Sequence, residues 1–292
     1  MTKYRVVHNN YYTFKSVVKN GSFKARLKPM NSLFQQVHFS QFVLRPLARK
    51  QTTEQDEFDN HVNYFEVVQG LQSFKLSAIH TVTTLTRPEI NLSQSQPWEQ
   101  VICQTLTNDE LIKYQPEENN IESYTSYDQA LLDYAKSSFE PGRPILDATH
   151  HLMQRIYRDF EYDSSATGVN TNAIDAFRLG RGVCQDFSHI AIACLQSLRL
   201  PVRYVSGYLD TQLISLNRFK IVPVSTSHAW FSVYDTELGW IDFDSTNNCM
   251  PDEKYITLAY GRDYNDIAPL SGQVDSIGQS QLDVRVELTK II

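Results

Sequence analysis

The strongest constraint on the fold is a cysteine that stands between a glycine turn and an amphipathic helix pattern. Residues 182–187 read GVCQDF, and glycine allows a tight turn immediately before the cysteine. Apolar residues then recur at helical spacing and form one stripe: Phe187, Ile190, Ala191, Cys194, Leu195 and Leu198. Pro201 lies just beyond this stripe and marks its end. The sequence therefore predicts Cys184 in the first turn of a helix that packs along one apolar face.

The surrounding patterns divide the chain into three parts. Residues 1–90 are predicted to form a small all-β domain, because residues 37–44, 61–68 and 74–82 have strand-like patterns. Residues 91–125 are rich in Pro, Gln, Ser, Asn and Glu, so we expect a linker that partly packs against the domains. Residues 126–292 are predicted to form the core domain, which contains Cys184.

Within that core, helical patterns precede strand patterns. Apolar residues recur at helical spacing over 127–135 and 147–160, ahead of the cysteine helix. Strand patterns follow at 202–208, 229–234 and 240–243, and residues 282–288 alternate like an edge strand. The sequence therefore predicts an α+β core.

Charge and cysteine content narrow the function classes. The formal net charge of −6 argues against a nucleic-acid partner and indicates no basic patch for a membrane. Four scattered cysteines without a CxxC pair predict neither a disulfide framework nor a zinc ribbon. We see no signal peptide or transmembrane segment, and expect a cytoplasmic protein in which Cys184 stays a free thiol.

Three residues along the chain match the parts of a thiol-based catalytic triad. Cys184 precedes His228, in SHAW, and Asp244, in DSTN. A thiolate nucleophile, its base and a carboxylate that orients the base are needed for acyl transfer. A helix N-terminus and a neighbouring imidazolium both favour the thiolate, and the backbone N–H of the cysteine is available to an oxyanion.

Counting along the strands predicts how the histidine meets the carboxylate. A hairpin centred on Thr236 places His228 opposite Asp244 on one face, roughly 4.5–5.5 Å apart at Cβ. Asp242, two residues earlier on the same face, is the rival for the carboxylate role. Zinc binding by the three residues is not favoured, because no second Cys or His lies at short ligand spacing. We expect no metal and no cofactor.

The chain resembles the bacterial two-domain branch of the transglutaminase-like superfamily. The motifs that carry the resemblance are FEYD at 160–163, GVCQDFSH at 182–189, RYVSGY at 203–208, SHAW at 227–230 and GRDY at 261–264. DEFDNHV at 56–62 carries it more weakly into the N-terminal domain. Together these motifs span nearly the whole chain.

The resemblance implies a papain-like core in which the nucleophile helix packs on an antiparallel sheet. It implies that Cys184 forms a thioester, that His228 shuttles the proton and that Asp244 fixes its tautomer. Two positions depart from the family pattern: Ser245 replaces a proline, and Asp59 replaces a glycine. Ser245 is expected to loosen the turn after Asp244, because proline fixes φ and serine does not.

Two further residues are candidates for shaping the site. Gln185 could donate to the oxyanion or be structural, and Trp230 could shield the site or be a core aromatic. The leading hypothesis is a cofactor-free cysteine enzyme that acts on peptide or protein amides, with hydrolysis slightly favoured. The alternatives are a transglutaminase that passes the acyl group to an amine, and a catalytically silent peptide-binding module.

Overall fold

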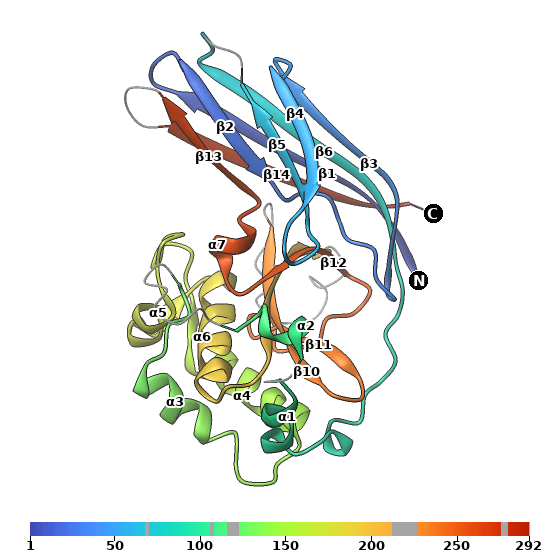
Figure 1. The fold of residues 1–292 in the computed structure, drawn as a ribbon, viewed down its shortest axis with the longest axis vertical. Coiled ribbons are helices and arrows are strands. Elements are labelled where there is room, and N and C mark those ends of the chain that lie inside the picture. Colours follow the sequence, from blue (N-terminus) through green and yellow to red (C-terminus); the bar gives the residue numbers. More distant parts are fainter. Residues whose placement is uncertain (68–69, 106–107, 116–122, 212–226, 276–279, 292) are drawn as a thin grey trace.

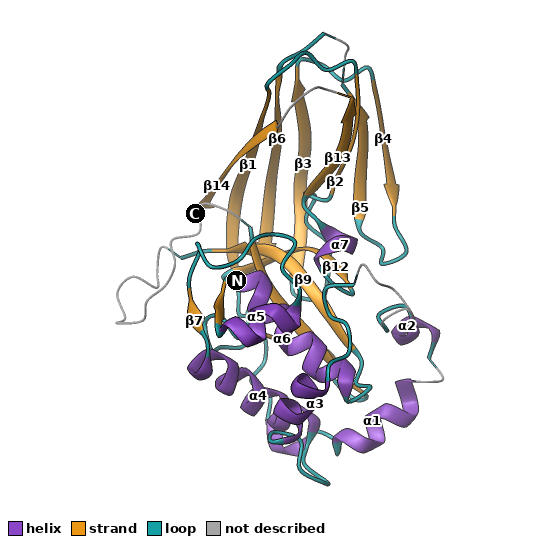
Figure 2. Ribbon diagram, turned by 90° about the vertical axis from the view of Figure 1, so that its left-hand side faces the viewer, coloured by secondary structure: helices purple, strands orange, loops and turns teal. Residues whose placement is uncertain are grey.

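The computed structural model describes residues 1–67, 70–105, 108–115, 123–211, 227–275 and 280–291. A β-sandwich forms one end of the molecule and an α+β core forms the other (Figure 1). The sandwich strands run lengthwise, and the core helices gather beyond their ends (Figure 2). This arrangement confirms the predicted fold class of a β-rich region followed by an α+β core.

The sandwich consists of two four-stranded antiparallel sheets. The first contains, in spatial order, β14 (Ser280–Ile291), β1 (Thr2–Phe14), β6 (Ser73–Thr84) and β3 (Gln35–Arg45). The second contains β13 (Leu270–Asp275), β2 (Asn20–Ala25), β5 (His61–Glu66) and β4 (Lys50–Gln55). Aromatic side chains join the two layers: Phe74 of the first sheet meets Phe23 of the second edge-to-face, with ring centroids 4.8 Å apart.

The last two strands return to the N-terminal sheets. β14 pairs with β1 from Lys3↔Ile291 to Phe14↔Ser280, and β13 pairs with β2. Residues 282–288 thus form an edge strand, as predicted, but at the edge of the sandwich. By strand pairing, residues 270–291 belong with the N-terminal sheets and not with the core to which the sequence analysis assigned them. The pairing joins the two ends of the chain, and no local pattern encodes such a contact.

The core packs helices against one antiparallel sheet. The sheet contains, in spatial order, β11 (Gly239–Phe243), β10 (His228–Asp235), β9 (Val202–Leu209) and β12 (Tyr255–Gly261). The helices are α3 (Gln129–Lys136), α4 (Ile145–Asp159), α5 (Ala173–Leu179) and α6 (Cys184–Ser197). Shorter elements are η1 (Leu92–Gln94), α1 (Trp98–Thr105), α2 (Asp109–Ile112), α7 (Tyr264–Ile267), β7 (Glu161–Tyr162) and β8 (Arg181–Gly182). No helix within the described ranges is long and apolar enough to cross a membrane.

Helix α6 lies at the centre of the core, in contact with α3, α4, α5, β9 and β10. Every residue from Gln185 to Gln196 is buried, so the helix is covered all round and not along one stripe. The polar residues of its second face therefore need partners. Ser188 donates to the carbonyl of Cys184 at 2.8 Å, and His189 Nε2 accepts from the backbone of Tyr264 at 3.1 Å.

The hairpin between β10 and β11 has a different register from the predicted one. Phe231 lies opposite Phe243 and Asp235 opposite Gly239, so the pairing is shifted by two residues. The turn is longer than expected because the Asp235 carboxylate caps it and Gly239 takes a left-handed φ of 74°. A shift of two preserves the face of each side chain. His228 and Asp244 therefore remain on one face, as diagonal neighbours.

Two side-chain amides from the sandwich region hydrogen-bond to β12, the edge strand of the core sheet. Gln35 donates to the carbonyl of Thr257 and accepts from its N–H, both at 2.8 Å. Asn60 does the same with Tyr260, at 2.7 and 2.8 Å. Each amide therefore replaces a strand partner for β12. Asp59, which precedes Asn60, has a φ of 66°, which explains the family's usual glycine there.

Replacing Gln35 by leucine should destabilise the protein by about 2–4 kcal/mol. The change removes the three hydrogen bonds of the Gln35 amide, with the carbonyls of Thr257 and Met30 and with the N–H of Thr257, and leaves that buried N–H without this acceptor. Urea unfolding measures the loss, and Gln36→Leu at the exposed neighbouring position is the control, expected within about 0.5 kcal/mol of the wild type. Equal unfolding midpoints for the two variants would contradict the role assigned to this amide.

Candidate active site

Cys184 is the first residue of α6, where local contacts hold the helix N-terminus in place. The carboxylate of Asp186 accepts from the Val183 N–H at 2.7 Å and from the Thr167 hydroxyl at 2.6 Å. A Cβ at Gly182 would lie 2.5 Å from that carboxylate, so only glycine fits there. The thiol is partly exposed at the positive end of the helix dipole. This position suits a nucleophile.

His228 and Asp244 form a buried hydrogen-bonded pair. His228 Nε2 lies 2.7 Å from Asp244 Oδ2, and their side chains are 3% and 0% exposed. The Cys184 side chain lies near enough to the same ring to help raise its pKa. Because Asp244 holds Nε2, Nδ1 is the nitrogen left for the thiol. The structure thus pairs two of the three predicted residues, His228 and Asp244, and places Cys184 near enough to the ring to act on its charge.

Four further hydrogen bonds fix the carboxylate of Asp244. Its Oδ1 accepts from the backbone N–H groups of Thr246 and Asn247, at 2.9 and 3.2 Å. Its Oδ2 accepts from the Asn247 amide at 2.7 Å and from the Tyr255 hydroxyl at 2.8 Å. Asn247 belongs to the DSTN motif and could have been chosen from the sequence. Tyr255 follows in a strand pattern that carries no signal for this role.

These contacts determine the charges of the pair. Burial opposes both charges, but the attraction of His228 and the hydrogen bonds around it hold the pKa of Asp244 below its usual range. Burial likewise opposes protonation of His228, but Asp244 and Cys184 raise the pKa of this ring to about 10. At neutral pH the stable form of His228 is therefore the imidazolium, which lies near the Cys184 side chain.

Ser245 has a contact that a proline at this position would lack. Its side chain is 1% exposed, and its hydroxyl donates to the carbonyl of Phe187 at 3.3 Å. This bond ties the turn after Asp244 to the helix that begins with Cys184. The expected loosening of this turn is thus offset by a direct link between the two halves of the site.

The structure places the remaining candidates outside the triad. Gln185 donates to the carbonyl of Val169 at 3.0 Å and so holds the loop before α5. Trp230 is fully buried and packs edge-to-face on Tyr255, at 5.3 Å between centroids. Asp242, the rival carboxylate, pairs with Arg87 at 2.8 Å and accepts from Ser232.

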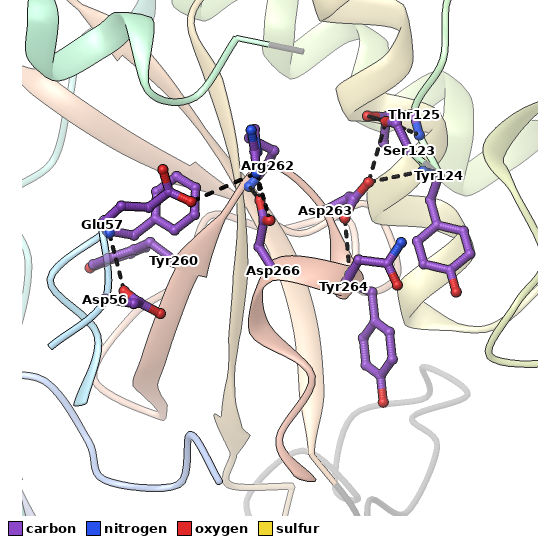
Figure 3. A network of polar contacts seen from close by, with 12 residues as sticks. Asp56, Glu57, Ser123, Tyr124, Thr125, Tyr260, Arg262, Asp263, Tyr264 and Asp266 are labelled. Carbon is purple, nitrogen blue, oxygen red and sulfur yellow. Dashed lines mark hydrogen bonds and ion pairs between the residues drawn. The ribbon is translucent and has the colours of Figure 1, made fainter. Parts of the chain in front are cut away.

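A second polar network links the nucleophile helix to the sandwich (Figure 3). Arg262 pairs with Asp266 at 2.8 Å and with Glu57 of the sandwich at 3.8 Å. Asp263 accepts from the Tyr124 N–H at 2.9 Å. The Tyr124 ring stacks on His189 of α6, at 5.3 Å between centroids. The GRDY motif therefore serves to join α6, α7 and the sandwich, away from the reacting atoms.

Metal-binding residues do not gather in the described part of the chain. Across those ranges, no three His, Cys, Asp or Glu side chains come together as possible ligands. Cys194 is fully buried in the core, where burial raises its thiol pKa, and burial raises the pKa of Cys249 to about 12. The described cysteines therefore differ strongly in environment, and Cys184 alone among them has an imidazole partner.

Comparison with known proteins now assigns the family. Residues 133–245 match the transglutaminase-like superfamily, and residues 4–83 match the bacterial transglutaminase-like N-terminal region. The "Uncharacterized protein Rv2569c" of Mycobacterium tuberculosis is 31% identical over 295 residues, covering 98% of this chain and 92% of that protein. The chain belongs to the transglutaminase-like superfamily.

Other transglutaminase-like relatives differ in how much they share. "Uncharacterized protein ML0607" of Mycobacterium leprae is 30% identical over the whole of both chains. A Pseudomonas aeruginosa protein-glutamine gamma-glutamyltransferase is 27% identical over 49% of this chain and 22% of its own length. A crystal structure from Cytophaga hutchinsonii, named as a candidate cysteine protease, has a TM-score of 0.72 at 20% identity over 100% of this chain and 91% of that one. This likeness confirms the fold.

Replacing Asp244 by asparagine should lower the pKa of His228 from about 10, because the attraction of the carboxylate for the imidazolium is lost. NMR titration of ¹⁵N-labelled histidine rings measures the change. Asp252→Asn, which removes a partly exposed partner of Lys254, is the control and should leave His228 unchanged. A midpoint for His228 that is the same in Asp244→Asn and the wild type would contradict the coupling.

The same pair gives stability a defined pH dependence. The pKa of His228 is raised above its ordinary 6.5. The contribution of this ring to the free energy of unfolding is therefore complete below pH 6.5 and is lost as the pH rises through about 10. The pKa of Asp244 is lowered, so the dependence is opposite. Its carboxylate contributes to the free energy of unfolding above pH 3.8, the ordinary pKa of Asp, and this contribution is lost as the pH falls through the pKa of the folded state. Urea unfolding should show both losses in the wild type, and both should shrink in Asp244→Asn. An identical pH profile in that variant would argue against the pair.

Proposed function

We propose that this protein is a cysteine-dependent enzyme that cleaves peptide or protein amides through a thioester, with Cys184, His228 and Asp244 as its catalytic triad. The observation that carries the proposal is the 2.7 Å bond between His228 and Asp244. The nearby Cys184 side chain helps to raise the pKa of the same ring. Family membership supports this assignment, because a transglutaminase-like core is present around these residues.

In the first step, the Cys184 thiolate attacks the amide carbonyl carbon. Unpaired N–H groups at the start of α6 stabilise the oxyanion that forms. When the intermediate collapses, the C–N bond breaks and the His228 imidazolium gives its proton to the leaving amine. The acyl group remains on Cys184 as a thioester. Asp244 keeps Nε2 occupied throughout, so that Nδ1 does the proton transfer.

In the second step, a water molecule attacks the thioester. Neutral His228 takes the proton from this water, the C–S bond breaks, and the acid product leaves behind the thiolate–imidazolium pair. An amine in place of water would give a new amide, which is the transglutaminase alternative. The Cytophaga hutchinsonii structure, named as a candidate cysteine protease, aligns with the whole of this chain and supports hydrolysis as the first choice.

Cys184→Ala should lower the amount of acyl-enzyme by about 10³-fold or more, because no other described thiol lies beside an imidazole. Incubation with p-nitrophenyl acetate followed by mass spectrometry detects the acyl group. Cys194→Ala, at a fully buried position, is the matched control and should acylate like the wild type.

Addition of putrescine after acylation separates the two reactions. Release of acetate in preference to the acetylated amine supports hydrolysis, and the reverse supports transfer. Equal acylation of Cys184→Ala and the wild type would contradict the proposal that Cys184 is the nucleophile. Peptide binding that survives Cys184→Ala, with no acyl-enzyme in the wild type, would assign the protein as a binding module.

A further inference from the structure

Charge is divided unevenly between the two parts of the molecule. Residues 1–90, which supply six of the eight sandwich strands, contain 12 Lys or Arg and six Asp or Glu. The rest of the chain contains 15 Lys or Arg and 27 Asp or Glu. The formal net charge of −6 therefore averages a basic sandwich with an acidic core. A local excess of one sign attracts partners of the opposite sign.

Part of this excess lies on one sheet face of the sandwich. In the sheet β14–β1–β6–β3, Tyr4 and Val6 point inward and are fully buried. Side chains alternate between the two faces of a strand, so Arg5 and Val7, the next residues after Tyr4 and Val6, point outward. The register then defines the outward face as Gln36, Phe39, Gln41, Val43, Arg45, Lys3, Arg5, Val7, Asn9, Tyr11, Lys75, Ser77, Ile79, Thr81, Thr83, Asp283, Arg285, Glu287, Thr289 and Ile291.

The outward face has an apolar centre and basic ends. Val7 and Ile79 are partners at its middle, and Phe39 at its edge is 49% exposed. Its basic residues are Lys3, Arg5, Arg45, Lys75 and Arg285, and its acidic residues are Asp283 and Glu287. Arg285 pairs with Asp283 at 2.9 Å, so the remaining charges are mainly positive. Apolar centres with polar rims are typical of protein interfaces.

Nothing in the described part of the chain covers this face. The core packs at the ends of the strands, and no helix lies over the sheet in either view (Figures 1 and 2). Strand spacing and rise give the face dimensions of roughly 19 by 33 Å. The resulting area, on the order of 600 Å², is smaller than the ~800 Å² per partner of a stable complex. The face therefore suits a transient partner.

We propose that the outward face of β14–β1–β6–β3 docks acidic polypeptide segments of the substrate. The inference rests on the proposed function, which requires a peptide or protein substrate. Charge complementarity selects acidic partners. The apolar centre distinguishes a polypeptide, which carries apolar side chains among its acidic ones, from a nucleic acid bound through its phosphates.

Fluorescein-labelled poly-L-glutamate, titrated at low salt into the full chain carrying Cys184→Ala, tests the docking face without turnover. The triple variant Lys3→Glu/Arg5→Glu/Lys75→Glu should weaken binding about tenfold or more. The control triple Lys136→Glu/Arg158→Glu/Arg178→Glu makes the same change in net charge on exposed core helices, and should weaken binding about twofold or less. A neutral triple, Lys3→Gln/Arg5→Gln/Lys75→Gln, repeats the test if the reversed one does not fold.

Each outcome decides the proposal. Loss of binding confined to the sandwich variants supports it. Equal effects of the sandwich and control triples, or no binding of poly-L-glutamate at all, would overturn it. Tighter binding of a single-stranded DNA oligonucleotide, or of phosphatidylserine vesicles, would overturn the choice of a polypeptide. Because the assay uses Cys184→Ala, a failed docking face and a failed nucleophile are detected separately.

Discussion

The site depends on one buried hydrogen bond, between His228 and Asp244. Removing either partner would leave the other buried without its opposite charge, which is costly in a low-dielectric interior. The surrounding structure is arranged around this bond: the turn after Asp244 donates its N–H groups, and Tyr255 adds its hydroxyl from the next strand. In the proposed mechanism, the resulting positive charge on His228 activates the Cys184 thiol.

The sandwich contributes to this arrangement even though it supplies none of the three residues. Tyr255 stands at the start of β12, and Gln35 and Asn60 of the sandwich region hold that strand from its open side. Asp263 ties the end of the same strand to α6 through Tyr124 and His189. The core sheet therefore has no free edge at β12, and its geometry depends on the sandwich.

Local patterns predicted the nucleophile helix well, because Cys184 and its apolar stripe lie within one element. The strand register predicted for His228 and Asp244 was wrong by two residues. The two side chains still meet, because a shift of two residues leaves each side chain on the same face of the sheet. Tyr255 and the return of β14 to β1 could not be predicted, since both are contacts between distant segments. The positive charge of the sandwich was not predicted, because the net charge of −6 sums over the whole chain and conceals the difference between its two parts.

The most direct test of the central claim is the rate at which iodoacetamide alkylates Cys184 as the pH is varied, in the wild type and in His228→Ala. If the thiolate–imidazolium pair exists, the wild type should stay reactive well below the ordinary thiol pKa of about 8.5, and His228→Ala should lose that reactivity. Identical profiles with the midpoint of an ordinary thiol would contradict the account, because the three residues would then not act as one unit.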